Sequence, residues 1–350
     1  MKKLLIKISF FVIPFFLLFI LKENFYSKKK GDLYRLGYVF DTKEYNSEVL
    51  FKSYYKKKLF KNVTEIDLDK NNSFDLISIG DSFSEQVESG YQNNIMYKSN
   101  KSVLNINRNL YDNPIQILNN LLNGDFFKTN KTKYIVLQNV ERLFVERSLE
   151  VPKDLVFTID SIKQKSIKSS IKKEEKKEEK KTEEFLSRDM IRFVMYNFNY
   201  LYDDNANVSD TYIVKTDKEL FSNASNNLLF FKEDITALKY NNDKARVENL
   251  NNELNYLAEK LEKLDIKLIV LLVPDKYDLY FNNISNNEKY TKPLLFDYLN
   301  KMDKKYIYLD GKNTFSKLIN TKKDIYLYDD SHWSPVGSDI IASEILRICK

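Results

Sequence analysis

The sequence has few of the residue types on which many functional sites depend. Among its 350 residues there are one cysteine, one histidine and one tryptophan, with only 7 glycines and 6 prolines. A single cysteine, Cys349, excludes an intrachain disulfide and a metal site built from several cysteines. The lone histidine, His332, is the one side chain whose unperturbed pKa suits acid–base chemistry near neutral pH.

The chain also lacks a strong excess of charge of either sign. It has 56 basic and 50 acidic residues, for a net charge of +6. No arginine stripe, RNA-binding signature or zinc-ligand spacing accompanies this small excess, so we expect no nucleic-acid partner. Hydrophobic residues at 43% and aromatic residues at 14% indicate a globular body.

The most apolar run of the sequence lies near its start. Residues 8–21 are uncharged and rich in Phe, Leu and Ile, and basic residues precede them. This pattern is typical of a signal peptide or a signal anchor. Because no small-x-small cleavage pattern follows, residues 1–27 are predicted to be an uncleaved single-pass anchor in the cell membrane, with a buried core helix as the alternative. The body would then be extracytoplasmic, either periplasmic or at the cell surface.

Strands and helices are predicted to alternate from Phe74 onward, which implies a doubly wound and mostly parallel sheet. In such sheets, functional residues gather at the carboxyl ends of the strands. The predicted strands are residues 75–79, 102–107, 134–140, 266–273 and 306–309, and helices are predicted to start at Ser84, to cover 113–122 and 247–264, and to start at Ser334.

We divide the chain into an anchor, a membrane-proximal segment and a main domain. Residues 28–70 form the membrane-proximal segment, and the main domain covers 71–350. Residues 160–185 contain a run of Lys and Glu without an apolar face, which predicts an exposed insertion. Residues 185–245 are left open as either a separate lobe or a lid.

Ser82 follows the first predicted strand, within Gly80-Asp81-Ser82-Phe83-Ser84. A serine at a strand-to-helix turn is exposed at the edge of the sheet, but its hydroxyl needs a base to become a good nucleophile. His332 can be that base, and either Asp330 or Asp329 can hold its tautomer. The distance of about 250 residues along the chain is no obstacle, because the fold assembles such groups.

These two segments resemble the SGNH (GDSL-type) hydrolase superfamily. The segment around Ser82 is similar to its first block, and Asp330-Ser331-His332-Trp333 is similar to the D-x-H-W block of its acyltransferase branch, which includes alginate O-acetyltransferases and related cell-envelope proteins. Residues 273–280 also resemble a stretch that recurs in these proteins. The resemblance implies an SGNH-like, flavodoxin-like three-layer α/β/α fold. It also implies that Ser82 is the nucleophile, His332 the base and Asp330 its orienter, with Asp329 as the reserve.

The sequence departs from the superfamily pattern in two ways. The alginate enzymes place D-x-H-W before the serine, whereas here it comes last, and the glycine and G-x-N-D blocks of ordinary SGNH hydrolases are missing. Asn107 and Arg142 are therefore the candidates for oxyanion or substrate-binding donors, although Arg142 could equally form a structural ion pair with Glu141. Trp333 is expected to be a wall of the site.

The favoured prediction is a membrane-anchored O-acetyltransferase that modifies a cell-envelope or secreted polysaccharide through an acyl-enzyme on Ser82. The resemblance implies two partners, a polysaccharide acceptor and a membrane-bound O-acyltransferase that supplies the acyl group. This mechanism requires no metal and no soluble cofactor. A carbohydrate esterase with the same triad and a non-catalytic polysaccharide-binding or assembly protein on an SGNH scaffold are the alternatives.

Overall fold

The central sheet is built from the apolar runs of the sequence. The computed structural model describes residues 2–26, 30–41, 47–106, 108, 110–165, 188–222 and 226–350. Within these residues six strands form one sheet in the order β1-β3-β2-β4-β7-β8, and all neighbouring strands are parallel. The strands are β1 (Lys61–Asn62), β2 (Asn72–Ile79), β3 (Val103–Ile106), β4 (Asn130–Val140), β7 (Lys267–Val273) and β8 (Ile307–Asp310). The predicted α/β fold with a parallel sheet is confirmed.

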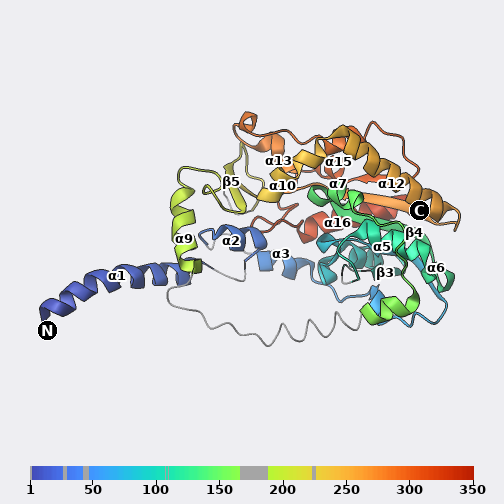
Figure 1. Cartoon of the computed structure of the whole chain (residues 1–350), viewed down its shortest axis with the longest axis horizontal. Helices are drawn as coiled ribbons and strands as arrows, with labels where there is room; N and C mark the ends of the chain where they lie inside the picture. The colour runs from blue at the N-terminus through green and yellow to red at the C-terminus, as the bar shows by residue number, and fades with distance from the viewer. Residues whose placement is uncertain are drawn as a thin grey trace.

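Helices cover both faces of this sheet (Figure 1). Successive side chains of a strand point to opposite faces, so Leu76 and Ile269 pack into one core cluster while Ile77 and Val270 pack into the other. The first cluster includes residues of α4 (Tyr91–Lys98), α13 (Lys276–Tyr280), α15 (Gly311–Ser316) and α16 (Pro335–Ile348); the second includes residues of α5 (Pro114–Asn123), α7 (Glu141–Leu149), α12 (Lys244–Glu262) and α14 (Leu295–Leu299). The sheet is therefore the middle of three layers.

The order of the strands determines where a site can form. From β2 the chain first adds β3 on one side and then β4, β7 and β8 on the other. The carboxyl ends of β2 and β4 flank the point where this winding reverses, which is where ligands bind in open α/β sheets. Ser82 follows the end of β2 by three residues and so lies at this point.

The predicted helices over residues 113–122, over 247–264 and from Ser334 are present as α5, α12 and α16. All three begin at side-chain caps, and that of α12 is Asp243, which accepts a hydrogen bond from the N–H of Ala245. Asn113 accepts a hydrogen bond from the N–H of Ile115, and Ser334 accepts one from the N–H of Val336.

The helix predicted to start at Ser84 is wrong. The chain forms two short 3₁₀ turns, Ser82–Ser84 and Val87–Ser89, and the α-helix begins only at Tyr91. Val87 has a φ of 44°, in the left-handed region, which is incompatible with a right-handed helix that continues through it.

Residues 188–222 and 226–245 pack against the rest of the described chain. They contain a two-stranded antiparallel hairpin that the sequence did not predict. Its buried residues Val214, Leu228 and Phe230 belong to the same core cluster as Trp333. The elements of this part are α9 (Arg188–Asn199), β5 (Thr211–Lys215), β6 (Asn227–Phe231), α10 (Lys232–Thr236) and α11 (Leu238–Asn241).

The N-terminal apolar run is helical and projects from the body (Figure 1). In α1 (Lys2–Phe25) most side chains are exposed. No single helix of the described residues is long and apolar enough to cross a membrane, but the two parts of α1, Lys2–Phe10 and Val12–Phe25, meet these criteria together across a bend of 42°. Three further short helices are α2 (Asp32–Gly37), α3 (Ser47–Tyr54) and α6 (Phe126–Thr129). Most of the predicted charged insertion, from residue 166 onward, lies outside the described residues.

Candidate active site

The turn that carries Ser82 is held by the buried carboxylate of Asp81. One oxygen of Asp81 accepts hydrogen bonds from the N–H of Phe83 at 3.2 Å and from Nε2 of Gln138 at 2.9 Å. The other accepts from the N–H of Val140 at 2.8 Å and from Nη1 of Arg147 at 2.9 Å. Asp81 therefore ties the end of β2 to the end of β4.

The charge of Asp81 is stabilised by these partners. Burial alone would raise the pKa of this carboxyl, but the charge of Arg147 and the hydrogen bonds from Val140 and Gln138 outweigh it and lower the pKa below its usual value. Gly80 allows this tight packing, because a Cβ at position 80 would collide with Oγ of Ser84. The local sequence thus fixes the backbone on which Ser82 is presented.

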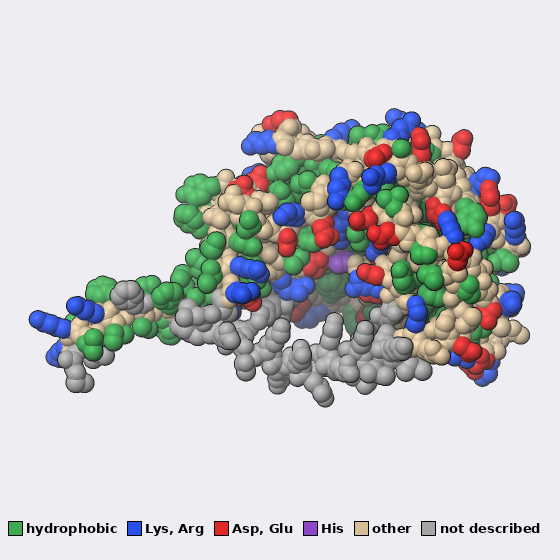
Figure 2. All heavy atoms as spheres, in the orientation of Figure 1, with side chains coloured by type: hydrophobic (Ala, Val, Ile, Leu, Met, Phe, Trp, Pro, Cys, Tyr) green, Lys and Arg blue, Asp and Glu red, His purple; other side chains and the backbone are tan. Residues whose placement is uncertain are grey.

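The structure brings Ser82, His332 and Asp330 together in one chain of hydrogen bonds. The Oγ of Ser82 is 2.7 Å from Nε2 of His332, and Nδ1 of His332 is 2.6 Å from Oδ1 of Asp330. Because an ionised carboxylate only accepts hydrogen bonds, neutral His332 carries its proton on Nδ1 and accepts at Nε2 from the hydroxyl of Ser82. The side chains of His332 and Asp330 are 24% and 19% exposed, and Figure 2 shows the histidine in a recess of the surface.

The carboxylates near His332 favour its protonated form. Burial lowers the pKa of His332, and the charge of Arg142 lowers it further. The hydrogen bond and charge of Asp330 and the charge of Asp32 raise it. The net effect is a pKa above 6.5. The pKa of Asp330 lies far below its usual value, because the partners that hydrogen-bond its ionised form outweigh the effect of burial.

Lys276 fixes the loop that carries Asp330 and His332. Its side chain is buried, and Nζ donates hydrogen bonds to the backbone carbonyls of Leu327 at 2.8 Å, Tyr328 at 3.0 Å and Asp330 at 3.1 Å. Burial lowers the pKa of Lys276 to about 8, although nearby carboxylates oppose this shift. The ammonium group thus satisfies three carbonyls of one loop.

The comparison with protein families concerns the part of the chain that contains this loop. Residues 224–349 match the family model of the SGNH hydrolase-like domain of the acetyltransferase AlgX. This part of the chain is thus similar to the SGNH hydrolase-like domain of an acetyltransferase. The predicted resemblance is confirmed over these residues, which include Lys276, Asp330 and His332, whereas Ser82 precedes them. Comparisons with the curated proteins and with the solved structures found no match.

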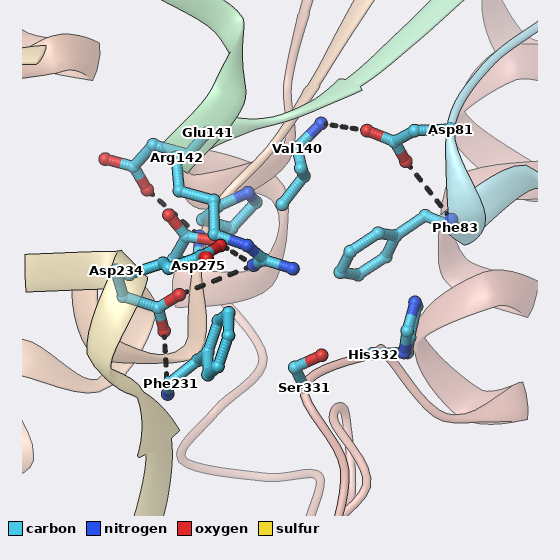
Figure 3. Close-up of polar contacts among 12 residues, drawn as sticks. Asp81, Phe83, Val140, Glu141, Arg142, Phe231, Asp234, Asp275, Ser331 and His332 are labelled. Carbon is cyan, nitrogen blue, oxygen red and sulfur yellow. Dashed lines mark hydrogen bonds and ion pairs between the residues drawn. The ribbon is translucent and has the colours of Figure 1, made fainter. Parts of the chain in front are cut away.

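Arg142 lies in a buried ion-pair cluster near His332. Its Nη1 is 2.6 Å from Oδ1 of Asp275 and 3.4 Å from Oδ1 of Asp234. Figure 3 shows the guanidinium between these carboxylates and the space in front of His332. The alternative pairing with Glu141 is wrong, because Glu141 instead accepts a hydrogen bond from the N–H of Asp275 at 3.0 Å.

Trp333 does not line the site as expected. Its side chain is fully buried, and Nε1 donates a hydrogen bond to Oε1 of Gln86 at 2.6 Å. Its ring meets the ring of Phe83 edge-on at a centroid distance of 5.2 Å. Trp333 is therefore a support inside the core, behind both the serine turn and the histidine loop.

Two predicted site residues remain, Asn107 and Asp329. Asn107 lies outside the described residues. Asp329 is buried and accepts a hydrogen bond from the N–H of Gly31 at 3.0 Å, so the carboxylate in contact with Nδ1 of His332 is that of Asp330.

Asp32 is a neighbour of the site that the sequence did not reveal. Its Oδ2 is 3.9 Å from Nδ1 of His332. Among the described residues, Asp32, Asp330 and His332 are the one group of His, Cys, Asp or Glu side chains close enough to hold a metal ion. Nδ1 of His332 and Oδ1 of Asp330 already bond to each other, which fits an acid–base pair. No spacing or periodicity links position 32 to position 332, so only the fold could find this contact.

Proposed function

We propose that this protein is a membrane-anchored, extracytoplasmic SGNH-type O-acetyltransferase that modifies a cell-envelope or secreted polysaccharide through an acyl-enzyme. The observation that carries the proposal is the hydrogen-bonded chain Ser82–His332–Asp330 at the switch point of the sheet. The match of residues 224–349 to the domain of an acetyltransferase supports the type of reaction.

The geometry suits a two-step transfer. In the first step Nε2 of His332 takes the proton of Ser82 as Oγ attacks the carbonyl carbon of an acetyl ester. The proton then goes to the leaving alkoxide, and an acetyl ester forms on Ser82. In the second step His332 takes the proton of a sugar hydroxyl that attacks this ester, and returns it to Oγ of Ser82 as the serine leaves. Asp330 stabilises the imidazolium in both steps.

The oxyanion of each tetrahedral intermediate needs donors. The backbone N–H of Ser82 at the start of its turn is one candidate, and Arg142 and Asn107 remain the candidate side chains. The guanidinium of Arg142 is held by Asp234 and Asp275 and points toward the space beside His332, which supports an electrostatic role (Figure 3).

The N-terminal helix is the basis for the proposed location. We infer that α1 anchors the protein in the cell membrane with the body on the periplasmic or cell-surface side. An acyl donor partner in the same membrane, a membrane-bound O-acyltransferase, would then be held close to the site. The exposed apolar side chains of α1 and the combined length of its two parts support the anchoring in the membrane.

A carbohydrate esterase is the second candidate function. The side chain of His332 is 24% exposed, so water can reach the acyl-enzyme as an alternative acceptor. The outcome distinguishes the two: a transferase gives an acetylated oligosaccharide when acceptor is added to an acetyl ester donor, whereas an esterase releases free acetate at a rate that no acceptor changes.

The proposal is tested in cells by Ser82→Ala. We expect the variant to lose O-acetylation of the polysaccharide, because no acyl-enzyme can form. Ser343→Ala, which changes an exposed serine of α16, is the matched control and is expected to leave acetylation unchanged. Full acetylation in cells that hold normal amounts of the Ser82 variant would contradict the proposal and support a non-catalytic role.

A further inference from the structure

The segment that follows α1 wraps around the loop that carries Asp330 and His332. The N–H of Gly31 donates a hydrogen bond to Oδ2 of Asp329 at 3.0 Å, and the N–H of Tyr34 donates to the carbonyl of Asp329 at 3.2 Å. A Cβ at position 31 would collide with this carbonyl, so the approach needs glycine. Segments 298 residues apart in the sequence are thus hydrogen-bonded, and one of the bonds joins two backbone groups.

Asp32 braces this loop from two directions. Its Oδ1 accepts a hydrogen bond from the N–H of Ser331 at 2.7 Å, and its Oδ2 accepts one from the hydroxyl of Ser331 at 2.5 Å. In return, the N–H of Asp32 donates to Oδ2 of Asp330 at 3.0 Å. The other oxygen of Asp330 receives both the N–H and Nδ1 of His332. Asp330 is therefore held on one side by His332 and on the other by Asp32, which fixes the plane of its carboxylate.

Asp32 also acts on His332 through its charge. Three charged groups face the imidazole from three different elements: Asp330 from its own loop, Asp32 from the start of α2, and Arg142 from α7. The two carboxylates favour the imidazolium and the guanidinium disfavours it. Asp32 is thus the second carboxylate that favours the protonated form of His332.

The same segment is connected to the end of α1. The N–H of Asp41 donates a hydrogen bond to the carbonyl of Phe25 at 2.7 Å, and Asp41 forms an ion pair with Lys30 at 3.3 Å. Residues 30–41 therefore contact α1 at one end and the histidine loop at the other.

We propose that Asp32 is a positioning residue of the active site, and that this site is complete only when the segment following α1 is seated on the histidine loop. The catalytic consequence rests on the proposed Ser82–His332 mechanism. The positioning itself does not, because it concerns the state of His332 in the resting protein.

The lone histidine allows a direct test by nuclear magnetic resonance. In the full chain, labelled with nitrogen-15 and held in lipid nanodiscs, every imidazole signal belongs to His332. We expect Asp32→Asn to lower the pKa of His332 and to weaken the preference for the Nδ1–H tautomer. The value of kcat for an acetyl ester donor should fall by roughly tenfold to a hundredfold, because a small misplacement of a catalytic group has such an effect, while KM changes little.

Asp32→Glu keeps the charge near His332 and should restore the raised pKa and part of kcat. Asp75→Asn removes a partly buried carboxylate from the amino-terminal half of β2 and is the matched control, expected to change neither quantity. If folded Asp32→Asn protein has the His332 pKa, tautomer and kcat of the unmodified chain, the proposal is overturned. If Asp32→Asn does not fold, Asp32→Glu is the test, because it shifts the carboxylate away from its normal position. An entirely normal kcat in Asp32→Glu would then overturn the proposal.

The two proposals fail in different ways. If Ser82→Ala leaves acetylation intact, the mechanism is wrong, and the resonance measurement on Asp32→Asn still decides whether Asp32 positions His332. If instead Ser82→Ala abolishes acetylation and Asp32→Asn changes nothing, only the role of Asp32 is wrong.

Discussion

The chemistry of single residues in this site is set by the charges around His332. Asp330 bonds to Nδ1 at 2.6 Å, and the imidazole pKa lies above 6.5 because Asp330 and Asp32 outweigh burial and Arg142. A histidine with a raised pKa is half-protonated at a higher pH than usual. In the proposed mechanism, its surroundings would therefore set the pH range over which Ser82 is activated.

The first prediction concerns pH. Because His332 must be neutral to accept the proton of Ser82, activity should rise with pH through the His332 pKa, with the midpoint above 6.5. In Asp330→Asn the carboxylate that raises this pKa is gone, so the midpoint should move to lower pH. We also expect kcat to fall by roughly 10²- to 10⁴-fold, since the tautomer is no longer held. The measurement is the pH–rate profile with an acetyl ester donor.

Asp329→Asn is the control for that profile. Asp329 accepts a hydrogen bond from the N–H of Gly31, whereas Asp330 is the carboxylate bonded to Nδ1 of His332. Burial raises the pKa of Asp329. Its substitution should therefore reduce kcat less than Asp330→Asn does. An equal or larger loss with the same shift in the profile would make Asp329 the orienter.

At the scale of elements, the ends of β2 and β4 are joined by one buried ion pair. The side chains of Asp81 and Arg147 are 2% and 10% exposed, and their charged atoms are 2.9 Å apart. Removing one member of such a pair leaves the other charge buried without its partner, which destabilises more than removing both.

The second prediction follows from this pair. Arg147→Met should lower the free energy of unfolding by about 3–5 kcal/mol, and the double variant Asp81→Asn/Arg147→Met should lose less than the sum of the single losses. Urea unfolding of the four proteins measures this. Glu48→Gln, which breaks an exposed pair with Lys52, should change the free energy by about 0.5 kcal/mol or less. Strictly additive losses would show that Asp81 and Arg147 do not act together.

The same pair has a defined dependence on pH. The pKa of Asp81 is lower in the folded protein than in the unfolded chain, so the folded state favours the ionised carboxyl. Its stabilising contribution is fully present above the unfolded pKa of about 4 and is lost as the pH falls through the folded pKa. The difference in stability between the unmodified chain and Asp81→Asn should therefore shrink on acidification.

At the scale of the whole molecule, an apolar helix is attached to a mixed α/β body through the segment that contacts the histidine loop. The third prediction is that the full chain sediments with membranes and resists extraction at alkaline pH, whereas a chain without residues 2–26 is released. This deletion retains Gly31 and Asp32. The fluorescence of the single, buried Trp333 reports whether the shortened chain is folded. Extraction of both chains to the same extent would contradict anchoring by α1.

Most of the main sheet could be predicted from the sequence because its strands are short apolar runs followed by recognisable breaks. Residues 75–79 and 266–273 have this pattern, and both are strands in the structure. The hairpin β5–β6 was missed, because its two strands lie in a stretch without the strand–helix alternation that revealed the others. The early helix start at Ser84 was wrong because Val87 adopts a positive φ, which no apolar periodicity signals.

By itself, the sequence determined the parallel α/β fold, the lone histidine His332 as the candidate base and the serine turn that could face it, because periodicity and residue type carry this information locally. Only the tertiary structure decided that Asp330 and not Asp329 meets Nδ1, that Trp333 is internal, and that Lys276 and Asp32 hold the histidine loop. The physical reason is that these contacts join segments distant along the chain. Each depends on the direction in which a side chain leaves its backbone, and that direction is set by packing.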